Sequence, residues 1–325
     1  MNARGQRAAV LEGNGAVKVV QSRRPEPGAR EVRVRLEGCG VCASNLPLWQ
    51  GRAWFRYPCA AGAPGHEGWG RIDALGAQVR DLQIGERVAV ISQHAYAQYD
   101  VAARAAVVPL PAALDGMPFP GEPLGCVMNI FERSDIRAGH SVAIVGAGFL
   151  GVLLVQLAVR SGAQVFVTSR RAYALAQARA AGAHETMSSD PPHAAIRRGL
   201  ELTAGRGFDR VIEAAGEQST LDIAGALAAE RARLVIAGYH QDGRREVDLQ
   251  AWNWRGLDVV NAHERSIERY AGGVAAAVDA VLDGRLDPFP LLTHSLPLES
   301  LDRAFALTAD RPDGFMKASV RMEEA

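Results

Sequence analysis

The sequence has little cysteine, no excess of charge and no long apolar run. Its four cysteines stand at irregular positions, 39, 42, 59 and 126, and do not form a disulfide framework. Lys plus Arg equals Asp plus Glu at 36 each, which argues against a broad basic surface for nucleic acid or anionic lipid. The first residues lack the apolar core of a signal peptide, and no later segment is as long and apolar as a membrane span. We therefore expect a cytoplasmic protein with reduced thiols.

Internal repeats and low-complexity segments are also absent, and the length of 325 residues suggests two domains with a core each. Apolar residues make up 48% and charged residues 22%, which is typical of a soluble globular protein. In the first third, short segments bounded by glycine and proline predict β-strands. These segments are residues 7–11, 16–20, 31–36 and 86–91.

The pattern changes near Ser141, where strand-like and helix-like segments begin to alternate. Residues 141–145 form a nearly continuous apolar run, as in a parallel strand covered on both faces, and an apolar helix is predicted at 150–160. This alternation predicts an α/β fold with a doubly wound parallel sheet. Further strands are predicted at 165–168, 209–213, 233–237 and 257–260, and further helices at 171–181, 219–228 and 270–282.

A glycine motif follows the apolar strand at 141–145. Gly146, Gly148 and Gly151 have the spacing G-x-G-x-x-G, with Phe149 and Leu150 between the last two. The first glycine permits a tight turn, the second lets the backbone approach a pyrophosphate, and the third lets helix and strand pack closely. A glycine-rich turn can simply be a turn, but this one joins an apolar strand to an apolar helix. The sequence therefore predicts a dinucleotide-binding site.

The residue after the second strand of this region indicates which dinucleotide binds. An NAD site usually has an acidic residue there, about 20 residues after the glycines, to accept a hydrogen bond from the ribose 2′-hydroxyl. This chain has Ser169, followed by Arg170 and Arg171. A hydroxyl and two guanidinium groups suit a 2′-phosphate, whereas the alternative is that the arginines only begin a solvated helix. We expect NADP in preference to NAD.

Cys42, His66 and Glu122 supply a thiolate, an imidazole and a carboxylate, a set that suits zinc. Each is predicted on a turn after a strand and outside a helix interior. Three protein ligands would leave one coordination position open, which is typical of catalytic zinc. Taken singly, Cys42 could be a buried thiol and His66 a core histidine. A metal and a nicotinamide cofactor together point to hydride transfer at an alcohol or carbonyl carbon.

Cys39 and Cys42 also form a C-x-x-C motif, which can indicate thiol redox chemistry or half of a zinc knuckle. No second such motif exists in the sequence to complete a four-thiolate site, and the helix expected beside a redox motif is not apparent. We favour neither interpretation.

Together these motifs resemble the medium-chain dehydrogenase/reductase superfamily, in its zinc-dependent alcohol and polyol (sorbitol-like) dehydrogenase branch. The resemblance implies a GroES-like β-rich catalytic domain at 1–122 and 267–325, a Rossmann domain at 123–266, and one catalytic zinc. It also implies a homodimer or homotetramer that acts on a small alcohol, polyol or carbonyl compound. The segments that carry the resemblance are 38–44, 65–70, 85–88, 122–124, 146–151 and 211–216.

The resemblance also assigns residues in the metal site. Glu122, in the E-P-L segment, occupies the position of the third ligand, and Cys126 is its competitor four residues on. Glu67, beside His66, is in this family either a ligand or a close neighbour of the metal. Asn45 stands where the branch usually has an aspartate that accepts a hydrogen bond from the histidine ligand. We expect the amide to accept that bond without carrying charge.

Two other departures concern the structural metal and the proton path. The lobe with four clustered cysteines that holds a structural zinc is absent, so a second zinc is not expected. Pro47 stands where many members have a proton-relay histidine, while Ser44 matches the relay hydroxyl. His94 is a further candidate for the proton path, and Asn261 and His263 for holding the carboxamide of the cofactor; all three could equally be structural.

Four aromatic residues lie between Cys42 and His66, where the family places part of its substrate pocket. They would suit stacking on a sugar or aromatic ring, or could form only a local core. Three other functions stay open: a zinc-free quinone or enoyl reductase, a binding protein without turnover, and a zinc lyase or epimerase. The aromatic residues are Trp49, Trp54, Phe55 and Tyr57.

Overall fold

The computed structural model describes residues 5–322, which divide into two compact units. The first unit consists of three segments: the chain up to Gly125, Arg265–Leu282, and the chain from Phe289 onward. The second takes Cys126–Glu264 and Asp283–Pro288. Within the described range, no helix combines the length and apolar character that crossing a membrane requires.

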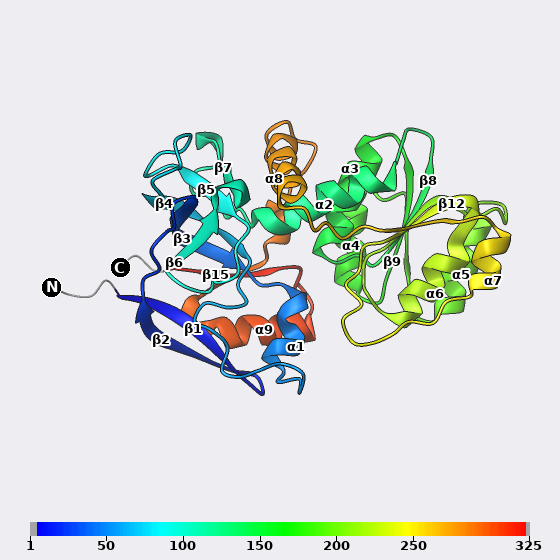
Figure 1. The fold of residues 1–325 in the computed structure, drawn as a ribbon. Coiled ribbons are helices and arrows are strands. Elements are labelled where there is room, and N and C mark those ends of the chain that lie inside the picture. Colours follow the sequence, from blue (N-terminus) through cyan, green and yellow to red (C-terminus); the bar gives the residue numbers. More distant parts are fainter. Residues whose placement is uncertain (1–4, 323–325) are drawn as a thin grey trace. The chain divides into compact units, whose positions relative to one another are not determined.

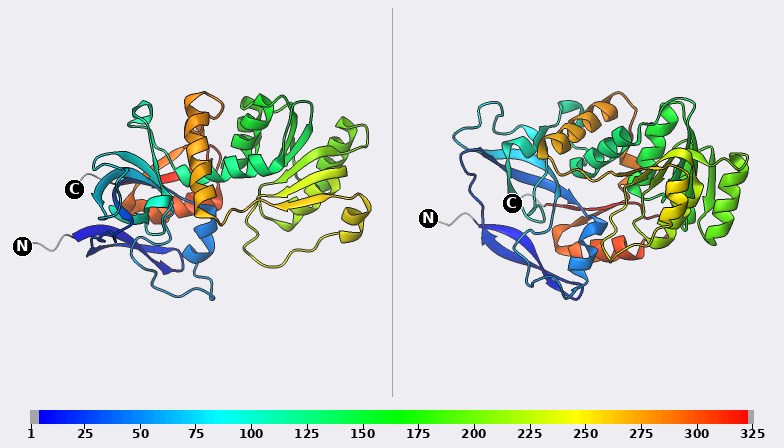
Figure 2. Two further views of the ribbon diagram at one scale, coloured as in Figure 1. Left: turned by 45° about the horizontal axis from the view of Figure 1, so that its top comes forward. Right: turned by 45° about the vertical axis from the view of Figure 1, so that its right-hand side comes forward.

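The first unit is built on a seven-stranded sheet in the order β14-β15-β3-β4-β5-β7, with β6 also paired to β3. A separate antiparallel hairpin, β1 with β2, is drawn in dark blue in Figure 1. Helices α1 and α9 lie side by side in both views of Figure 2, and Trp49 of α1 stacks on Phe305 of α9 with ring centroids 5.7 Å apart. The core of this unit is therefore shared between the sheet and α9.

The strands of the first unit are β1 (Gly5–Gly13), β2 (Ala16–Arg23), β3 (Glu31–Gly40), β4 (Glu67–Leu75), β5 (Arg87–Val90), β6 (Tyr99–Ala103), β7 (Val107–Pro109), β14 (His294–Pro297) and β15 (Ala318–Arg321). Its helices are α1 (Leu46–Trp49), α8 (Ile267–Leu282) and α9 (Leu301–Asp310), and α2 (Gly121–Ser134) begins in it.

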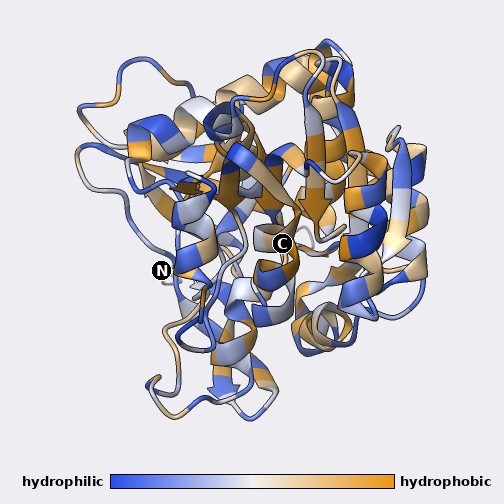
Figure 3. Cartoon of the chain, turned by 90° about the vertical axis from the view of Figure 1, so that its right-hand side faces the viewer, coloured by the Kyte–Doolittle hydropathy of each residue, from blue (hydrophilic) through white to orange (hydrophobic). Residues whose placement is uncertain are grey.

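The second unit is a six-stranded parallel sheet in the order β10-β9-β8-β11-β12-β13. Numbered from β8, this is the 3-2-1-4-5-6 order of dinucleotide-binding folds. Helices α3 and α4 cover one face and α5 and α6 the other (Figure 1). Figure 3 shows the central strands largely in the hydrophobic colour, which agrees with the burial of most of their residues. The prediction of a doubly wound parallel sheet is confirmed.

The strands of the second unit are β8 (Ser141–Val145), β9 (Gln164–Ser169), β10 (Glu185–Ser188), β11 (Phe208–Glu213), β12 (Ala228–Ile236) and β13 (Asp258–Asn261). Its helices are α3 (Phe149–Arg160), α4 (Ala172–Ala180), α5 (Pro192–Leu202), α6 (Gln218–Leu227) and α7 (Leu249–Trp254), with most of α2.

Candidate functional site

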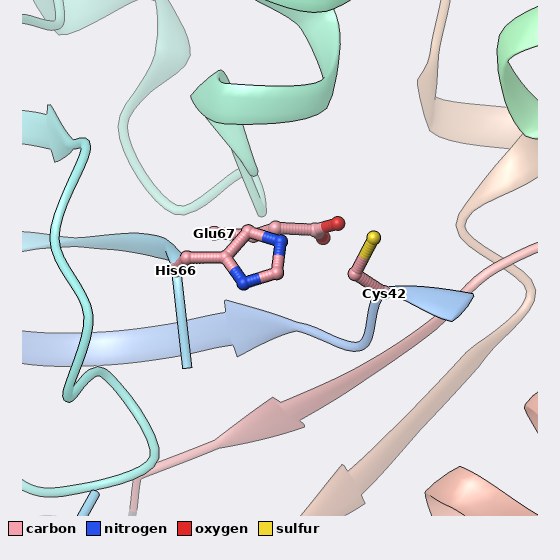
Figure 4. Close-up of side chains that lie close together, drawn as sticks. All are labelled: Cys42, His66 and Glu67. Carbon is pink, nitrogen blue, oxygen red and sulfur yellow. The ribbon is translucent and has the colours of Figure 1, made fainter. Parts of the chain in front are cut away.

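A group of three possible metal ligands forms where β3 and β4 meet. Cys42 follows the end of β3, and His66 and Glu67 stand at the start of β4. One ligand atom from each residue lies within 4.8 Å of the others, and Figure 4 shows the three side chains pointing toward one another. Thiolate, imidazole and carboxylate are donors that zinc accepts. The donor set at this place therefore fits zinc.

The register of the sheet makes room for Glu67. Its partner across the β3–β4 ladder is Gly40, and a Cβ atom added to that glycine would lie 1.8 Å from Glu67 Oε2. Any larger residue at position 40 would push the carboxylate away from the group. The glycine is needed here for close approach, not for an unusual backbone angle.

Glu67 has a buried cation as its partner. Lys317, just before β15, places its Nζ 2.6 Å from Glu67 Oε1, and the two side chains are 0% and 8% exposed for Glu67 and Lys317 respectively. Burial alone would lower the pKa of Lys317, but the nearby Glu67 charge raises it above its usual value. The second oxygen, Oε2, is buried and has no hydrogen-bond partner in the described protein. A buried, unpartnered carboxylate oxygen beside a thiol and an imidazole is what a bound cation would satisfy.

His66 is oriented by a main-chain carbonyl. Its Nδ1 donates to Pro64 O at 2.9 Å, so Nε2 is left to face Cys42. Asn45 does not accept this bond, in contrast to the sequence-based expectation. Its Nδ2 donates instead to the same carbonyl at 3.3 Å and to the hydroxyl of the buried Tyr96 at 3.1 Å. Asn45 therefore fixes the carbonyl that fixes the imidazole.

The charges around His66 favour its protonated form when no metal is bound. Burial disfavours the imidazolium, but the hydrogen bond and the negative charge of Cys42, with Glu122 and Glu67, outweigh burial and raise the pKa of His66 to about 10. A cation at this position would replace that proton.

Glu122 lies near the group but outside it. The sequence placed it on a turn after a strand, whereas the structure places it in the first turn of α2, where a carboxylate is favoured by the helix dipole. His66 was likewise expected after a strand but precedes β4. The hydroxyl of Tyr270, in α8, donates to Glu122 Oε1. Burial and the neighbouring Glu67 raise the pKa of Glu122, although His66 opposes them.

The structure brings Glu67 into the group with Cys42 and His66, whereas the choice of Glu122 as the third protein ligand stays a prediction. Among the described residues, the ligand atoms of Cys42, His66 and Glu67 lie within 4.8 Å of one another, and neither Glu122 nor its competitor Cys126 belongs to this group. Lys317 and Tyr270, which hold the two carboxylates, were missed by sequence reasoning. Each lies more than 140 residues along the chain from the carboxylate that it holds. The one signal in the sequence that could have pointed to Lys317 is a lysine within an otherwise apolar segment.

The candidates for the proton path differ in position. The Ser44 hydroxyl donates to Cys42 Sγ at 3.1 Å and is therefore beside the group. His94 is exposed, and its described contacts are with Asp100, to which its backbone N–H donates at 2.9 Å. Pro47 lies in the first turn of α1. Of these residues, only Ser44 is placed next to the ligands.

The aromatic residues between the ligands divide into two pairs. Trp49 Nε1 donates to Gly15 O at 2.9 Å, and the Tyr57 hydroxyl donates to Leu48 O at 2.6 Å, so both side chains are held by main-chain carbonyls, and Trp49 also packs against the core. Trp54 and Phe55 are 62% and 36% exposed and pack on each other with ring centroids 5.9 Å apart. The second pair is therefore the more exposed one.

In the second unit, the glycine motif has the geometry of a cofactor turn. Gly146 has a φ of +116°, and a Cβ on Gly151 would lie 1.9 Å from Gly146 O, so neither tolerates a side chain. A Cβ on Gly148, by contrast, would meet no protein atom within 4 Å. Gly148 is the N-cap of α3 and supplies no side-chain cap, and Phe149 and Leu150 open the first turn of the helix. These features suit a pyrophosphate at the helix N-terminus.

Ser169 ends β9, and its Oγ accepts the backbone N–H of Arg171 at 3.3 Å. This bond does not use the hydrogen of the hydroxyl, which can still be donated to a ligand. Arg170 is paired with Glu217 at 2.7 Å. Asn261 ends β13, and His263 follows it and contacts the ring of Tyr239, with centroids 6.4 Å apart. The five residues proposed from the sequence all lie in the second unit: Ser169, Arg170, Arg171, Asn261 and His263.

Comparisons with known proteins agree with both units. Residues 28–112 match the family model described as "Alcohol dehydrogenase GroES-like domain", and residues 150–283 match the model described as "Zinc-binding dehydrogenase". The expectation of a GroES-like β-rich domain beside a Rossmann sheet is therefore confirmed.

Individual relatives span most of the chain. Galactitol 1-phosphate 5-dehydrogenase of Escherichia coli (strain K12) is 30% identical over 273 residues, which cover 73% of this chain and 76% of that protein. Sorbitol dehydrogenase of Ovis aries is 26% identical over 330 residues, covering 91% of both proteins.

Two solved structures show the same fold. One is described as a zinc-binding dehydrogenase of Sinorhizobium meliloti 1021 bound to NADP, with a TM-score of 0.83 and 25% identity over 98% of this chain and 99% of that chain. The other is the rspB alcohol dehydrogenase of Escherichia coli CFT073 in complex with NADH, with a TM-score of 0.86 and 23% identity over the same shares.

Proposed function

The chain belongs to the zinc-type alcohol dehydrogenases of the medium-chain dehydrogenase/reductase superfamily, in the polyol branch. We therefore propose that it transfers a hydride between NADP(H) and a polyol or its carbonyl counterpart, using one zinc. The observation that carries this proposal is the group of Cys42, His66 and Glu67. Within it, the buried Oε2 of Glu67 has no hydrogen-bond partner in the described protein. A zinc-free reductase has no need of such a group. A protein that only binds a dinucleotide has no need of this group either.

The ligand residues would hold zinc, which when bound supplies Lewis-acid polarisation of a substrate oxygen. Cys42, His66 and Glu67 would bind it directly, and Glu122 would lie beside it as a third negative group, after the Cys42 thiolate and the Glu67 carboxylate. The Ser44 hydroxyl, next to Cys42, would turn toward the substrate and take or pass the hydroxyl proton. In the second unit, Gly148 and the first turn of α3 would bind the pyrophosphate.

The substrate is proposed to be a polyol or sugar alcohol. Two relatives are named for sorbitol and galactitol 1-phosphate, and the exposed pair Trp54 and Phe55 offers faces on which a sugar ring can stack. NADP is proposed in preference to NAD because β9 ends in Ser169, with two arginines after it and no acidic residue. His94, Asn261 and His263 are retained as candidates for ordering the reactants.

The central test measures zinc and turnover together. Purified protein should contain one zinc per chain by mass spectrometry of the metal, and a chelator should remove zinc and activity in parallel. Polyols, sugars and aromatic alcohols are screened with NADP and with NAD by the absorbance of the reduced cofactor. C42A should lose zinc, whereas C59A, which changes a half-buried cysteine outside the group, should retain it. Full turnover without zinc would contradict the proposal.

We further propose a cytoplasmic homo-oligomer, a dimer or tetramer. The support is the outer edge of β13, which has no second strand partner within the described residues, and apolar side chains near it. Trp254 is 87% exposed, Leu249 67% and Val259 40%. An unpaired edge beside exposed apolar groups favours pairing with another copy. Light scattering after size-exclusion chromatography should give two or four chains, and W254E should lower that number.

A further inference from the structure

An ion pair joins two loops at the cofactor end of the parallel sheet. Arg170 directly follows β9, and Glu217 lies four residues beyond the end of β11. The Arg170 guanidinium donates from one terminal nitrogen to Glu217 Oε1 at 2.7 Å. This is the arginine on which the preference for NADP partly depends, and its charge is already matched by a carboxylate.

The pair spans the strand that carries the glycine turn. In the sheet, β8 lies between β9 and β11, and the three strands are parallel, so their carboxyl ends meet at one edge. Hydrogen bonds from Gly146 N to Thr168 O and from Ala214 N to Val145 O tie these ends together at 2.9 Å and 2.8 Å. Dinucleotides bind across this edge in folds of this kind. The ion pair therefore crosses the place that the adenosine half of the cofactor would occupy.

Glu217 is not a freely moving surface residue. It is the N-cap of α6, and its carboxylate accepts the backbone N–H of Thr220 while the Thr220 hydroxyl accepts the backbone N–H of Glu217. This capping box fixes the carboxylate within reach of Arg170. Arg170, 62% exposed, has no other described partner, so a ligand can draw it away.

We propose that Glu217 is a specificity-determining residue that limits the preference for NADP, because the 2′-phosphate must compete with its carboxylate for Arg170. The inference rests on the proposed function, since it assumes a dinucleotide at this edge. NAD has no 2′-phosphate, so its binding leaves the pair intact. NADP either separates the pair or places a phosphate dianion beside a carboxylate.

The test uses the full-length protein and two ligands that differ only in the 2′-phosphate. Isothermal titration at low ionic strength measures AMP and adenosine 2′,5′-bisphosphate, so neither zinc nor turnover is needed. E217Q keeps an oxygen for the helix cap and removes the charge. It should tighten the bisphosphate about fivefold and change AMP by less than about twofold. Retained AMP binding also shows that the variant is folded.

Two further variants isolate the mechanism. D222N removes a carboxylate from the exposed face of the same helix and should leave both ligands within about twofold of wild type. In an R170Q background, E217Q should no longer tighten the bisphosphate. An unchanged bisphosphate affinity in E217Q, an equal gain for AMP, or a full gain without Arg170 would each overturn the inference. A wild-type protein that binds neither ligand would overturn the proposed cofactor site as well.

Discussion

The metal-site residues and the cofactor-site residues are held in opposite ways. Glu67 and Lys317 form an ion pair with side chains 0% and 8% exposed, whereas Arg170 and Glu217 are 62% and 42% exposed. Removing one partner of a buried pair costs about 3–5 kcal/mol, but an exposed pair contributes only about 0.2–1 kcal/mol. Substitutions near the metal should therefore threaten the fold and metal binding together, while those near the cofactor should adjust ligand preference.

The largest expected effect comes from K317M. The substitution leaves the Glu67 carboxylate buried without its cation, and should lower the free energy of unfolding of the metal-free protein by about 3–5 kcal/mol. Bound zinc supplies another cation, so the loss should be smaller in the loaded protein. Chemical denaturation with and without zinc measures both values.

The chain offers a matched control, because it contains only one other lysine, Lys18, which is exposed on β2. K18M should change the free energy of unfolding by no more than about 0.5 kcal/mol. The double variant K317M/E67Q should recover part of the loss. Equal stability of K317M and K18M would show that the buried pair is not needed to compensate Glu67.

The next largest effect is expected from G40A. The added Cβ would lie 1.8 Å from Glu67 Oε2, so the carboxylate must move out of the ligand group. Zinc affinity, measured by competition with a chromophoric chelator, should fall about 10- to 100-fold. G272A places the same methyl group in open space on α8 and should not change the affinity. Equal zinc affinities in the two variants would mean that Glu67 is not a ligand.

The same contrast explains what the sequence could predict. The cofactor turn is contiguous in the chain, with Gly146, Gly148 and Gly151 between a strand and a helix, so local pattern alone identified both its fold and its position. The doubly wound sheet followed from the alternation of strands and helices. Among the missed elements, β10 (Glu185–Ser188) is only 4 residues long, whereas α5 (Pro192–Leu202) is amphipathic and its periodicity was overlooked.

The metal site depends on register and long-range packing. Cys42 and His66 were identified from residue type, but the place of Glu67 beside them depends on Gly40 being opposite Glu67 across two antiparallel strands. The partner Lys317 comes from the far end of the chain. The role of Asn45 was wrong because a backbone carbonyl, which no side-chain pattern reveals, orients the imidazole. Sequence patterns do not fix such pairings before the sheet is assembled.

The third largest effect is expected from alanine substitutions at two glycines of the cofactor turn. G148A adds a Cβ that meets no protein atom within 4 Å, so stability should hold while the methyl group blocks the pyrophosphate. The loss of hydrogen bonds to a charged group should weaken cofactor binding about tenfold or more. G151A instead collides with Gly146 O and should lower the melting temperature. Titration calorimetry and thermal unfolding separate the two; tight cofactor binding by G148A would place the pyrophosphate elsewhere.

The smallest effect concerns pH. In the metal-free protein the pKa of His66 is about 10, raised by the Cys42, Glu122 and Glu67 charges against the opposing effect of burial. At neutral pH the imidazole therefore carries a proton that zinc must displace, because only the neutral ring binds metal. Raising the pH removes the proton beforehand, so zinc affinity should increase by up to about tenfold per pH unit until the pH nears 10.

The stability of the metal-free protein should follow the opposite trend. A folded-state pKa above the ordinary value of 6.5 adds stability that is fully present below that pH and is lost as the pH rises toward 10. Zinc affinity and the free energy of unfolding are measured across this pH range in wild type and in H94N. This control changes an exposed histidine outside the group, so both quantities should depend on pH as they do in wild type. If zinc affinity stays flat between about pH 6 and 8, His66 is not the residue whose proton the metal replaces. In that case the buried charges around Cys42 compensate one another without a cation, and the contrast between the two sites would lose its physical basis.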